Sequence, residues 1–223
     1  MFCNEQSIEK LVYGLKNGNW PMISYYMRRT KVDLNRLCTI RPVWFRMFDP
    51  CFDKVASLGK ERRTRLIDTF YNLCEQKAID VNVQDVFGNT ALHLLVQIGE
   101  DDFSQILVDQ GADVNIQNDR QETPFSLAVF KGNYPLAAYF ADKREVQVHP
   151  FMMQQFLTFV MQQPGEMQPK ETLDFLQTYI RADINSFKDE KGNSYVSQIY
   201  QIAEKHVARQ SKGVKNERVK GNC

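Results

Sequence analysis

The chain has 223 residues, enough to bury a substantial core, and its 43% hydrophobic and 25% charged residues are typical of a soluble protein. The net charge of +1 argues against a general attraction to nucleic acid. Five cysteines are scattered and never stand at metal-ligand spacing, which favours free thiols and a reducing compartment: Cys3, Cys38, Cys51, Cys74 and Cys223.

We expect neither a targeting segment nor a membrane span. Residues 1–10 (MFCNEQSIEK) carry charge where a secretory signal peptide needs a continuous apolar core. The most apolar run, Phe151 to Met161, is interrupted by Gln154 and Gln155 and is too short to cross a bilayer. The composition therefore predicts a soluble protein acting inside a cell, in the cytoplasm.

Residues 4–35 predict a unit of two helices. Leu11 and Val12 give the apolar face of a first helix that ends at Gly18. Pro21 stands where a second helix begins and no amide hydrogen is needed.

Residues 36–82 form a second unit, which is longer than the first. The residues that make it longer fall at 48–60, which predicts either a lengthened first helix or an inserted loop. In proteins built from repeats, insertions map to loops on one face, often the binding face. A tolerated surface insertion explains the same residues equally well, because long loops close at little cost.

The clearest unit spans residues 83–115. A turn at Asp85 and Gly88 leads into a helix that Thr90 caps and Gly99 ends. A second apolar face follows at helical spacing, so we expect a second helix that packs antiparallel on the first.

Two motifs in this unit resemble the ankyrin repeat, whose signature is Thr-Pro-Leu-His-x-Ala followed by Gly-Ala-Asp-x-Asn. The matching segments are residues 90–93 (TALH) and 111–115 (GADVN). Ala91 replaces the proline, and Leu95 replaces a small residue where the two helices approach most closely, which implies slightly wider packing. The resemblance implies an all-α fold, an ankyrin-repeat solenoid of helix-turn-helix units with β-turn or hairpin connections.

The resemblance divides the whole chain into repeats. The predicted units are 4–35, 36–82, 83–115, 116–148 and 149–185, with a cap at 186–208 and a disordered basic tail at 209–223. The segment GNWP at 18–21 returns as GNYP at 132–135, as a repeated helix corner would. The loop at 163–169 is longer than the family's.

We predict no catalytic residue, no cofactor-binding residue and no metal ligand. His93 corresponds to the family position whose imidazole ties its own turn to the adjacent one, and His149 and His206 stand at no zinc spacing. No phosphate-binding glycine loop is present in the sequence. One alternative is an enzyme whose site is built from the two insertions, which would require a deep polar pocket containing a Cys or His.

Two basic clusters leave a second alternative open, a nucleic-acid or phosphoinositide binder. The clusters are Lys60, Arg62, Arg63 and Arg65, and Lys212, Lys215, Arg218 and Lys220. Glu61 and Glu217 dilute this charge, which favours a solvated helix face and a solubilising tail. Binding through either cluster would weaken steeply with salt.

The resemblance places partner binding on one concave surface made by first helices and turn tips. The residues predicted there are Tyr13, Lys16, Phe45, Phe48, Leu94, Gln97, Leu127, Phe130 and Lys131 from the first helices, and Val86, Phe87, Asn89, Asp119, Arg120 and Glu122 from the turn tips. Phe48, Phe87 and Phe130 are expected to anchor a protein segment. The competing interpretation is that these rings pack on neighbouring loops.

The predicted function is non-catalytic protein binding by a monomer that acts as an adaptor or inhibitor, without a small-molecule substrate. The irregular outer units are similar in style to the ankyrin-repeat effectors that intracellular bacteria deliver into host cells, or to viral ankyrin proteins. For such an effector the place of action would be the host-cell cytosol.

Overall fold

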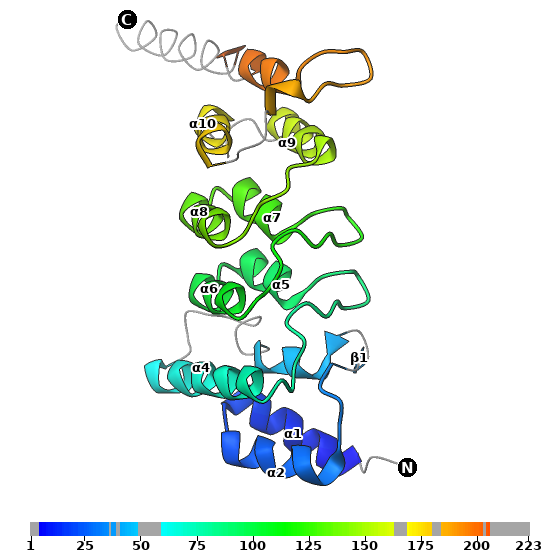
Figure 1. Ribbon diagram of the computed structural model, residues 1–223, viewed down its shortest axis with the longest axis vertical. Helices are drawn as coiled ribbons and strands as arrows, with labels where there is room; N and C mark the ends of the chain where they lie inside the picture. Colours follow the sequence, from blue (N-terminus) through cyan, green and yellow to red (C-terminus); the bar gives the residue numbers. More distant parts are fainter. Residues whose placement is uncertain are drawn as a thin grey trace, which may run out of the picture. The chain divides into compact units, whose positions relative to one another are not determined.

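The computed structural model describes residues 5–35, 37–38, 41–48, 59–162, 169–179, 184–202 and 204–205. Most of the predicted insertions, at 49–58 and 163–168, lie outside the described residues, as do His206 and the basic tail. The chain divides into two compact units, Met1–Pro124 and Phe125–Cys223. Within the described residues the fold is mostly helical, with one two-stranded hairpin (Figure 1).

The first unit is built from paired helices. Its elements are α1 (Glu5–Asn17), α2 (Trp20–Thr30), β1 (Leu37–Cys38), β2 (Arg41–Pro42), the 3₁₀ helix η1 (Val43–Phe48), α4 (Lys60–Glu75), α5 (Ala91–Ile98) and α6 (Asp101–Asp109). Helix α1 packs on α2, η1 and α4, and α5 packs on α6. The antiparallel strands pair Leu37 with Pro42 and Cys38 with Arg41.

The second unit repeats the helical pairing. Its elements are α7 (Pro124–Phe130), α8 (Tyr134–Lys143), α9 (Pro150–Gln162), α10 (Pro169–Tyr179) and the 3₁₀ helix η3 (Ile184–Ser186), and residues 195–202 are helical. Helices α8 and α10 are in contact, and an isolated bridge joins Lys188 to Ser194 before the last helix. None of the helices within the described residues has the length and apolar character needed to span a membrane.

The repeated GNWP and GNYP segments form the same helix corner, as predicted. Gly18 and Gly132 end the first helix of each pair with φ of 62° and 70°. In each corner the next residue is an asparagine whose Oδ1 accepts a hydrogen bond from the backbone N three residues later, at 3.2 Å from Asn19 and at 3.2 Å from Asn133. The proline then occupies the first turn of the second helix, where the amide donors have no intrahelical partner.

Helices α5 and α6 confirm the predicted pair in the clearest repeat. The Thr90 side chain caps α5, and Gly99 ends it with φ of 79°. Gly111 follows α6 with φ of 99°, a conformation that disfavours residues with a Cβ. Local capping chemistry therefore sets both ends of α5.

For the second repeat the sequence left open a lengthened first helix or an inserted loop, and residues 49–58, where most of the insertion falls, lie outside the described residues. A short 3₁₀ helix, η1, takes the place of the first helix, and its aromatic side chains turn into the core. Trp44 lies with ring centroids 4.7 Å from Phe45 and 5.8 Å from Phe48. Phe48 also meets Phe70 of α4 at 6.3 Å and Phe103 of α6 at 5.5 Å. An aromatic cluster thus fills the space between three helical elements.

This cluster corrects part of the predicted binding surface. Phe45 is 0% exposed and Phe48 is 1% exposed, so neither ring is available to a partner. Leu94, predicted on the same surface, is only 6% exposed. Burying these side chains gains roughly 1.5–3 kcal/mol each, a stabilisation that an exposed anchor would forgo.

Asp-x-Asn segments join successive repeats of the first unit. They are residues 33–35, 80–82 and 113–115, and in each the aspartate Oδ1 accepts a hydrogen bond from the asparagine backbone N at 2.8–2.9 Å. The Asn35 side chain accepts from the Asp80 backbone N at 2.7 Å, and the Asn82 side chain accepts from Asp113 N at 2.8 Å. Each asparagine therefore satisfies a backbone donor of the following repeat.

Candidate functional site

The loop before α5, residues 85–89, is closed by one carboxylate. Asp85 Oδ1 accepts hydrogen bonds from the backbone N of Phe87 and of Asn89, both at 2.9 Å. The Asp85 backbone N donates to Asn89 O at 2.8 Å. Gly88 supplies the positive φ of 73° that this turn requires. The loop tip is consequently held in one shape.

The loop before α7, residues 118–122, repeats this geometry with an amide in place of the carboxylate. Asn118 Oδ1 accepts from the backbone N of Arg120 at 2.9 Å and of Glu122 at 3.0 Å. The Asn118 backbone N donates to Glu122 O at 3.0 Å. Gln121 occupies the position of the glycine and has a φ of 59°, which is unfavourable for a residue with a Cβ.

Hydrogen bonds join the two loops. Asp119 N donates to Phe87 O at 3.1 Å, and Asn118 Nδ2 donates to Asn89 Oδ1 at 2.9 Å. The Gln84 side-chain amide donates to Gly88 O of the first loop and to Gln117 O, just before the second loop. Several independent contacts therefore hold the loops as one surface.

His93 connects the first loop and its helix to the second loop. Thr90 N donates to His93 Nδ1 at 3.1 Å, which leaves the proton of the neutral ring on Nε2. That Nε2 lies 3.0 Å from Glu122 O, to which it donates. The ring is 1% exposed, and burial lowers the pKa of His93 below its ordinary value of 6.5. The structure thus confirms the linking role that the sequence implied.

The tips of these two loops form the candidate functional site, which we term the loop-tip surface. It consists of Val86, Phe87, Asn89, Asp119, Arg120 and Glu122, all six of the predicted turn-tip residues. Val86 is 45% exposed and Phe87 is 54% exposed. Asp119 and Arg120 are also exposed, whereas the half-buried Asn89 and Glu122 hold the loops together. An apolar pair flanked by charge faces solvent here.

The residues predicted on first helices have mixed positions. Tyr13 is 60% exposed, and Gln97 and Lys131 are exposed as well. Lys16 and Leu127 are half-buried.

Phe130 is half-buried, and its ring stacks on Phe156 of α9 with centroids 6.2 Å apart and planes at 11°. Packing on a neighbouring element, the competing interpretation for the three predicted anchors, therefore describes Phe130 as well as Phe48. Phe87 keeps more than half of its surface exposed.

The basic cluster at the start of α4 is engaged within the chain. Arg62 donates to Lys16 O at 3.0 Å, and Arg65 pairs with Glu61 at 2.9 Å. Arg63 Nη2 lies 2.8 Å from carboxylate oxygens of both Glu100 and Asp102. These arginines stabilise the first unit, which weakens the interpretation of the cluster as a nucleic-acid or phosphoinositide site.

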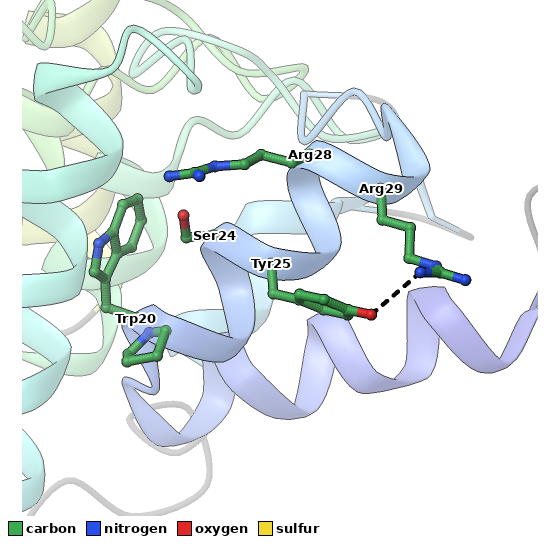
Figure 2. A pocket seen from close by; sticks show the side chains of 6 residues that line it. Trp20, Ser24, Tyr25, Arg28 and Arg29 are labelled. Carbon is green, nitrogen blue, oxygen red and sulfur yellow. Dashed lines mark hydrogen bonds between the residues drawn. The ribbon is translucent and has the colours of Figure 1, made fainter.

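Two hollows lie outside the predicted residues. One, lined by six residues of α2, has a volume of ≈ 440 Å³ (Figure 2). The other, of ≈ 300 Å³, is lined in the second unit by Gln154, Asp189, Glu190, Lys191 and Tyr195. Neither lining contains the Cys or His that the enzyme alternative requires. The spacing of Trp20, Ser24 and Arg28 along one helix face was the available signal for the first hollow.

The paired helices and the hydrogen-bonded loops define a helical repeat protein. Residues 62–150 match the family described as ankyrin repeats in three copies. Residues 62–150 therefore carry ankyrin repeats, in agreement with the resemblance found in the sequence.

Curated relatives match this chain over short stretches. The chain is 33% identical over 72 residues to SH3 and multiple ankyrin repeat domains protein 2 of Homo sapiens, a match covering 32% of this chain and 4% of the relative. It is 35% identical over 91 residues to alpha-latroinsectotoxin-Lt1a of Latrodectus tredecimguttatus, covering 41% of this chain and 6% of the relative. The matches thus span only a small fraction of either relative's length.

A solved structure shows a similar fold over most of the chain. It is the complex of the Bd0816 predatory endopeptidase from Bdellovibrio bacteriovorus with immunity protein Bd3460. One chain of that complex aligns with a TM-score of 0.56 and 17% identity, over 88% of this chain and 93% of the other. At this identity the likeness concerns the fold.

Proposed function

We propose that this chain is a non-catalytic protein-binding module that holds a target protein on its loop-tip surface, as an adaptor or inhibitor and as a monomer. Proteins built from such repeats use the extended surface along their repeats to bind other macromolecules. Ankyrin repeats generally mediate protein–protein interaction, and this chain carries them.

The exposure of Phe87 on a hydrogen-bonded loop carries the proposal. Phe87 is 54% exposed, although its backbone N and O are both held by hydrogen bonds. A side chain presented by a preorganised loop loses less conformational entropy on binding than one on a flexible loop. Arg120, on the adjoining loop, adds a residue type that is enriched with aromatics at binding hot spots.

An inhibitor is one form of this proposal. The similar fold seen in a complex of an endopeptidase with an immunity protein supports that form by analogy. The scattered cysteines favour action in a reducing cytoplasm, and for a delivered effector this would be the cytosol of the host cell.

Affinity capture tests the loop-tip surface. The wild-type chain and Phe87→Ser are immobilised and exposed to eukaryotic cell lysate, with Tyr71→Ser as the matched control. Tyr71 is an exposed aromatic of α4, at 38% exposure, outside the loop-tip surface. We expect a protein retained by the wild type and the control to be lost by Phe87→Ser.

Folding must be equal in the three proteins, as judged by circular dichroism and thermal melting. If Phe87→Ser retains the same proteins as the wild type, the loop-tip surface is not the binding site.

A further inference from the structure

The hollow on α2 is a surface separate from the loop tips. Its lining residues, which define the α2 hollow, are Trp20, Pro21, Ser24, Tyr25, Arg28 and Arg29. They recur every four residues along one face of the helix, whereas Ile23, on the face that packs inward, is 0% exposed. The hollow is therefore built by one continuous face of a single helix.

Positive charge in the hollow is not matched by an acidic side chain. Helix α2 contains no aspartate or glutamate, and the lining contains none either. Arg29 donates to Tyr25 Oη at 3.2 Å, while Arg28 is exposed and makes no hydrogen bond or ion pair with the residues that the structure describes. Figure 2 shows the Arg28 guanidinium extended over Ser24 on the side of Trp20, and Arg29 turned toward Tyr25.

The arginines of α4 differ from Arg28 in that they have acceptors within the chain. Arg62, Arg63 and Arg65 each have an acceptor on this chain, so their guanidinium groups contribute to folding. The guanidinium N–H donors of Arg28 are available to bind a ligand. A guanidinium fork matches a carboxylate through two parallel hydrogen bonds, which makes a carboxylate the chemically complementary group.

Apart from Ser24, the rest of the lining is apolar or aromatic. Tyr25 is 54% exposed, Pro21 is exposed and Trp20 is half-buried. Tryptophan, tyrosine and arginine are the residue types most enriched among the energetic centres of protein interfaces. A ligand that suits this hollow therefore combines a carboxylate with an apolar side chain, as an acidic protein segment does.

We propose that the α2 hollow binds an acidic segment of a partner protein, with a carboxylate on Arg28 and an adjacent apolar side chain against Trp20 and Pro21. Two arginines are fewer than the about four to eight basic residues that recognise an anionic membrane surface. The chain's net charge of +1 likewise favours a local acidic segment over the phosphate backbone of a nucleic acid. The proposal uses no residue of the loop-tip surface and stands independently of it.

Tryptophan fluorescence can report binding in the full chain. The sequence contains two tryptophans, and Trp44 is 0% exposed, so acrylamide quenching reports mainly on Trp20. The probes are 12-residue peptides that alternate Glu with Leu, free of tryptophan, and counterparts with every Glu replaced by Gln. We expect the Glu peptides to protect the fluorescence from quenching and the Gln peptides to fail.

Variants assign the effect to Arg28. Arg28→Gln should weaken the binding of the Glu peptides by about tenfold or more, because hydrogen bonds to a charged partner are lost. Arg65→Gln removes an arginine of 50% side-chain exposure on another helix and should leave binding unchanged. Phe87→Ser should also bind the peptides normally, which separates this test from that of the loop-tip surface.

Three results would overturn the proposal. The first is equal binding of the Glu peptides to the wild type and to Arg28→Gln. The second is equal protection by the Glu and Gln peptides, which would show a purely apolar hollow. The third is protection by a single-stranded oligonucleotide or by phosphatidylserine vesicles without protection by any Glu peptide, which would assign the hollow to a different class of partner.

Discussion

The second and third repeats fill corresponding positions by different chemistry. Residues 41–44 (RPVW) stand where residues 90–93 (TALH) stand in the next repeat. His93 is buried and bonded through both ring nitrogens, to Thr90 of its own loop and to Glu122 of the next. Trp44 is equally buried, but its contacts are with other aromatic rings. One inward position can thus be stabilised by hydrogen bonds or by aromatic packing.

The difference explains why Phe45 and Phe48, both predicted on the binding surface, are buried. Where the His93 network closes the loops, the following helix is a regular α-helix and the loop tip faces solvent. In the second repeat a short 3₁₀ helix points Phe45 and Phe48 into the core beside Trp44. A large apolar side chain is available for binding only where the core does not take it up.

The largest expected effect comes from breaking the aromatic cluster. Trp44→Ala should lower the free energy of unfolding by about 3–5 kcal/mol, because it removes a ring that contacts Phe45, Phe48 and Phe70. Urea unfolding followed by circular dichroism measures this loss. The exposed-site variant Phe87→Ser should change it by less than about 0.5 kcal/mol, and similar losses in both variants would contradict the assigned burial.

Removing the hydrogen-bonded imidazole should have a smaller effect. His93→Gln is expected to lower the free energy of unfolding by about 1–3 kcal/mol, because the buried groups of Thr90 and Glu122 lose well-placed partners. The same urea unfolding experiment applies. An unchanged midpoint would show that the network is dispensable.

The pH dependence separates the titration of His93 from its packing. Burial lowers the pKa of folded His93 below the ordinary 6.5, so the unfolded chain binds the proton more readily. The stability that neutral His93 contributes to the folded state is complete above the pKa of His93 in the unfolded chain. It is lost as the pH falls through that value, by at most about 1.4 kcal/mol for each pH unit. Between about pH 7.5 and about pH 5.5, the wild type should lose more stability than His93→Gln. Equal losses would contradict a depressed pKa.

The two loops of the loop-tip surface can be compared at their left-handed residue. Gly88→Ala should cost about 1–2 kcal/mol, because the positive φ disfavours a Cβ. The added carbon would also approach Asp119 N to 2.9 Å, where only backbone movement relieves the contact. Thermal melting measures the cost. Gly99→Ala is the matched control, since it shares the positive φ but no atom lies within 4 Å of its added carbon.

If Gly88→Ala melts no lower than this control, the close approach of the two loops is absent in solution.

The smallest effect should be a gain. Gln121 has a φ of 59° at the position that Gly88 holds in the preceding loop. Gln121→Gly should raise the free energy of unfolding by up to about 1 kcal/mol, since it relieves the strained backbone at some entropic cost. Differential scanning calorimetry would show a higher Tm, and a lower Tm would indicate that the Gln121 side chain makes a compensating contact.

Local chemistry explains the parts of the fold that could be predicted. Glycines, capping residues and prolines act within a few residues of themselves, so the ends of α5 and the recurring corner at Gly18 and Gly132 were readable along the chain. The position of the two-stranded hairpin and the 3₁₀ form of η1 were not readable, because residues 41–44 were expected to begin an α-helix by alignment with the motif. The exposure of Val86, Phe87, Asp119 and Arg120 was also predictable, because a loop tip is exposed by its place in the repeat.

The sequence by itself determined the repeat, the corners and the aspartate- or asparagine-closed loops, since each follows from contacts between near neighbours. Only the tertiary structure decided which aromatic and basic side chains are buried, which are paired and which remain exposed. Phe48 is buried because rings from α4 and α6 meet it, and Arg63 is neutralised by carboxylates from another repeat. Phe87 and Arg28 remain exposed for the same physical reason: burial and pairing depend on what distant segments bring to a side chain.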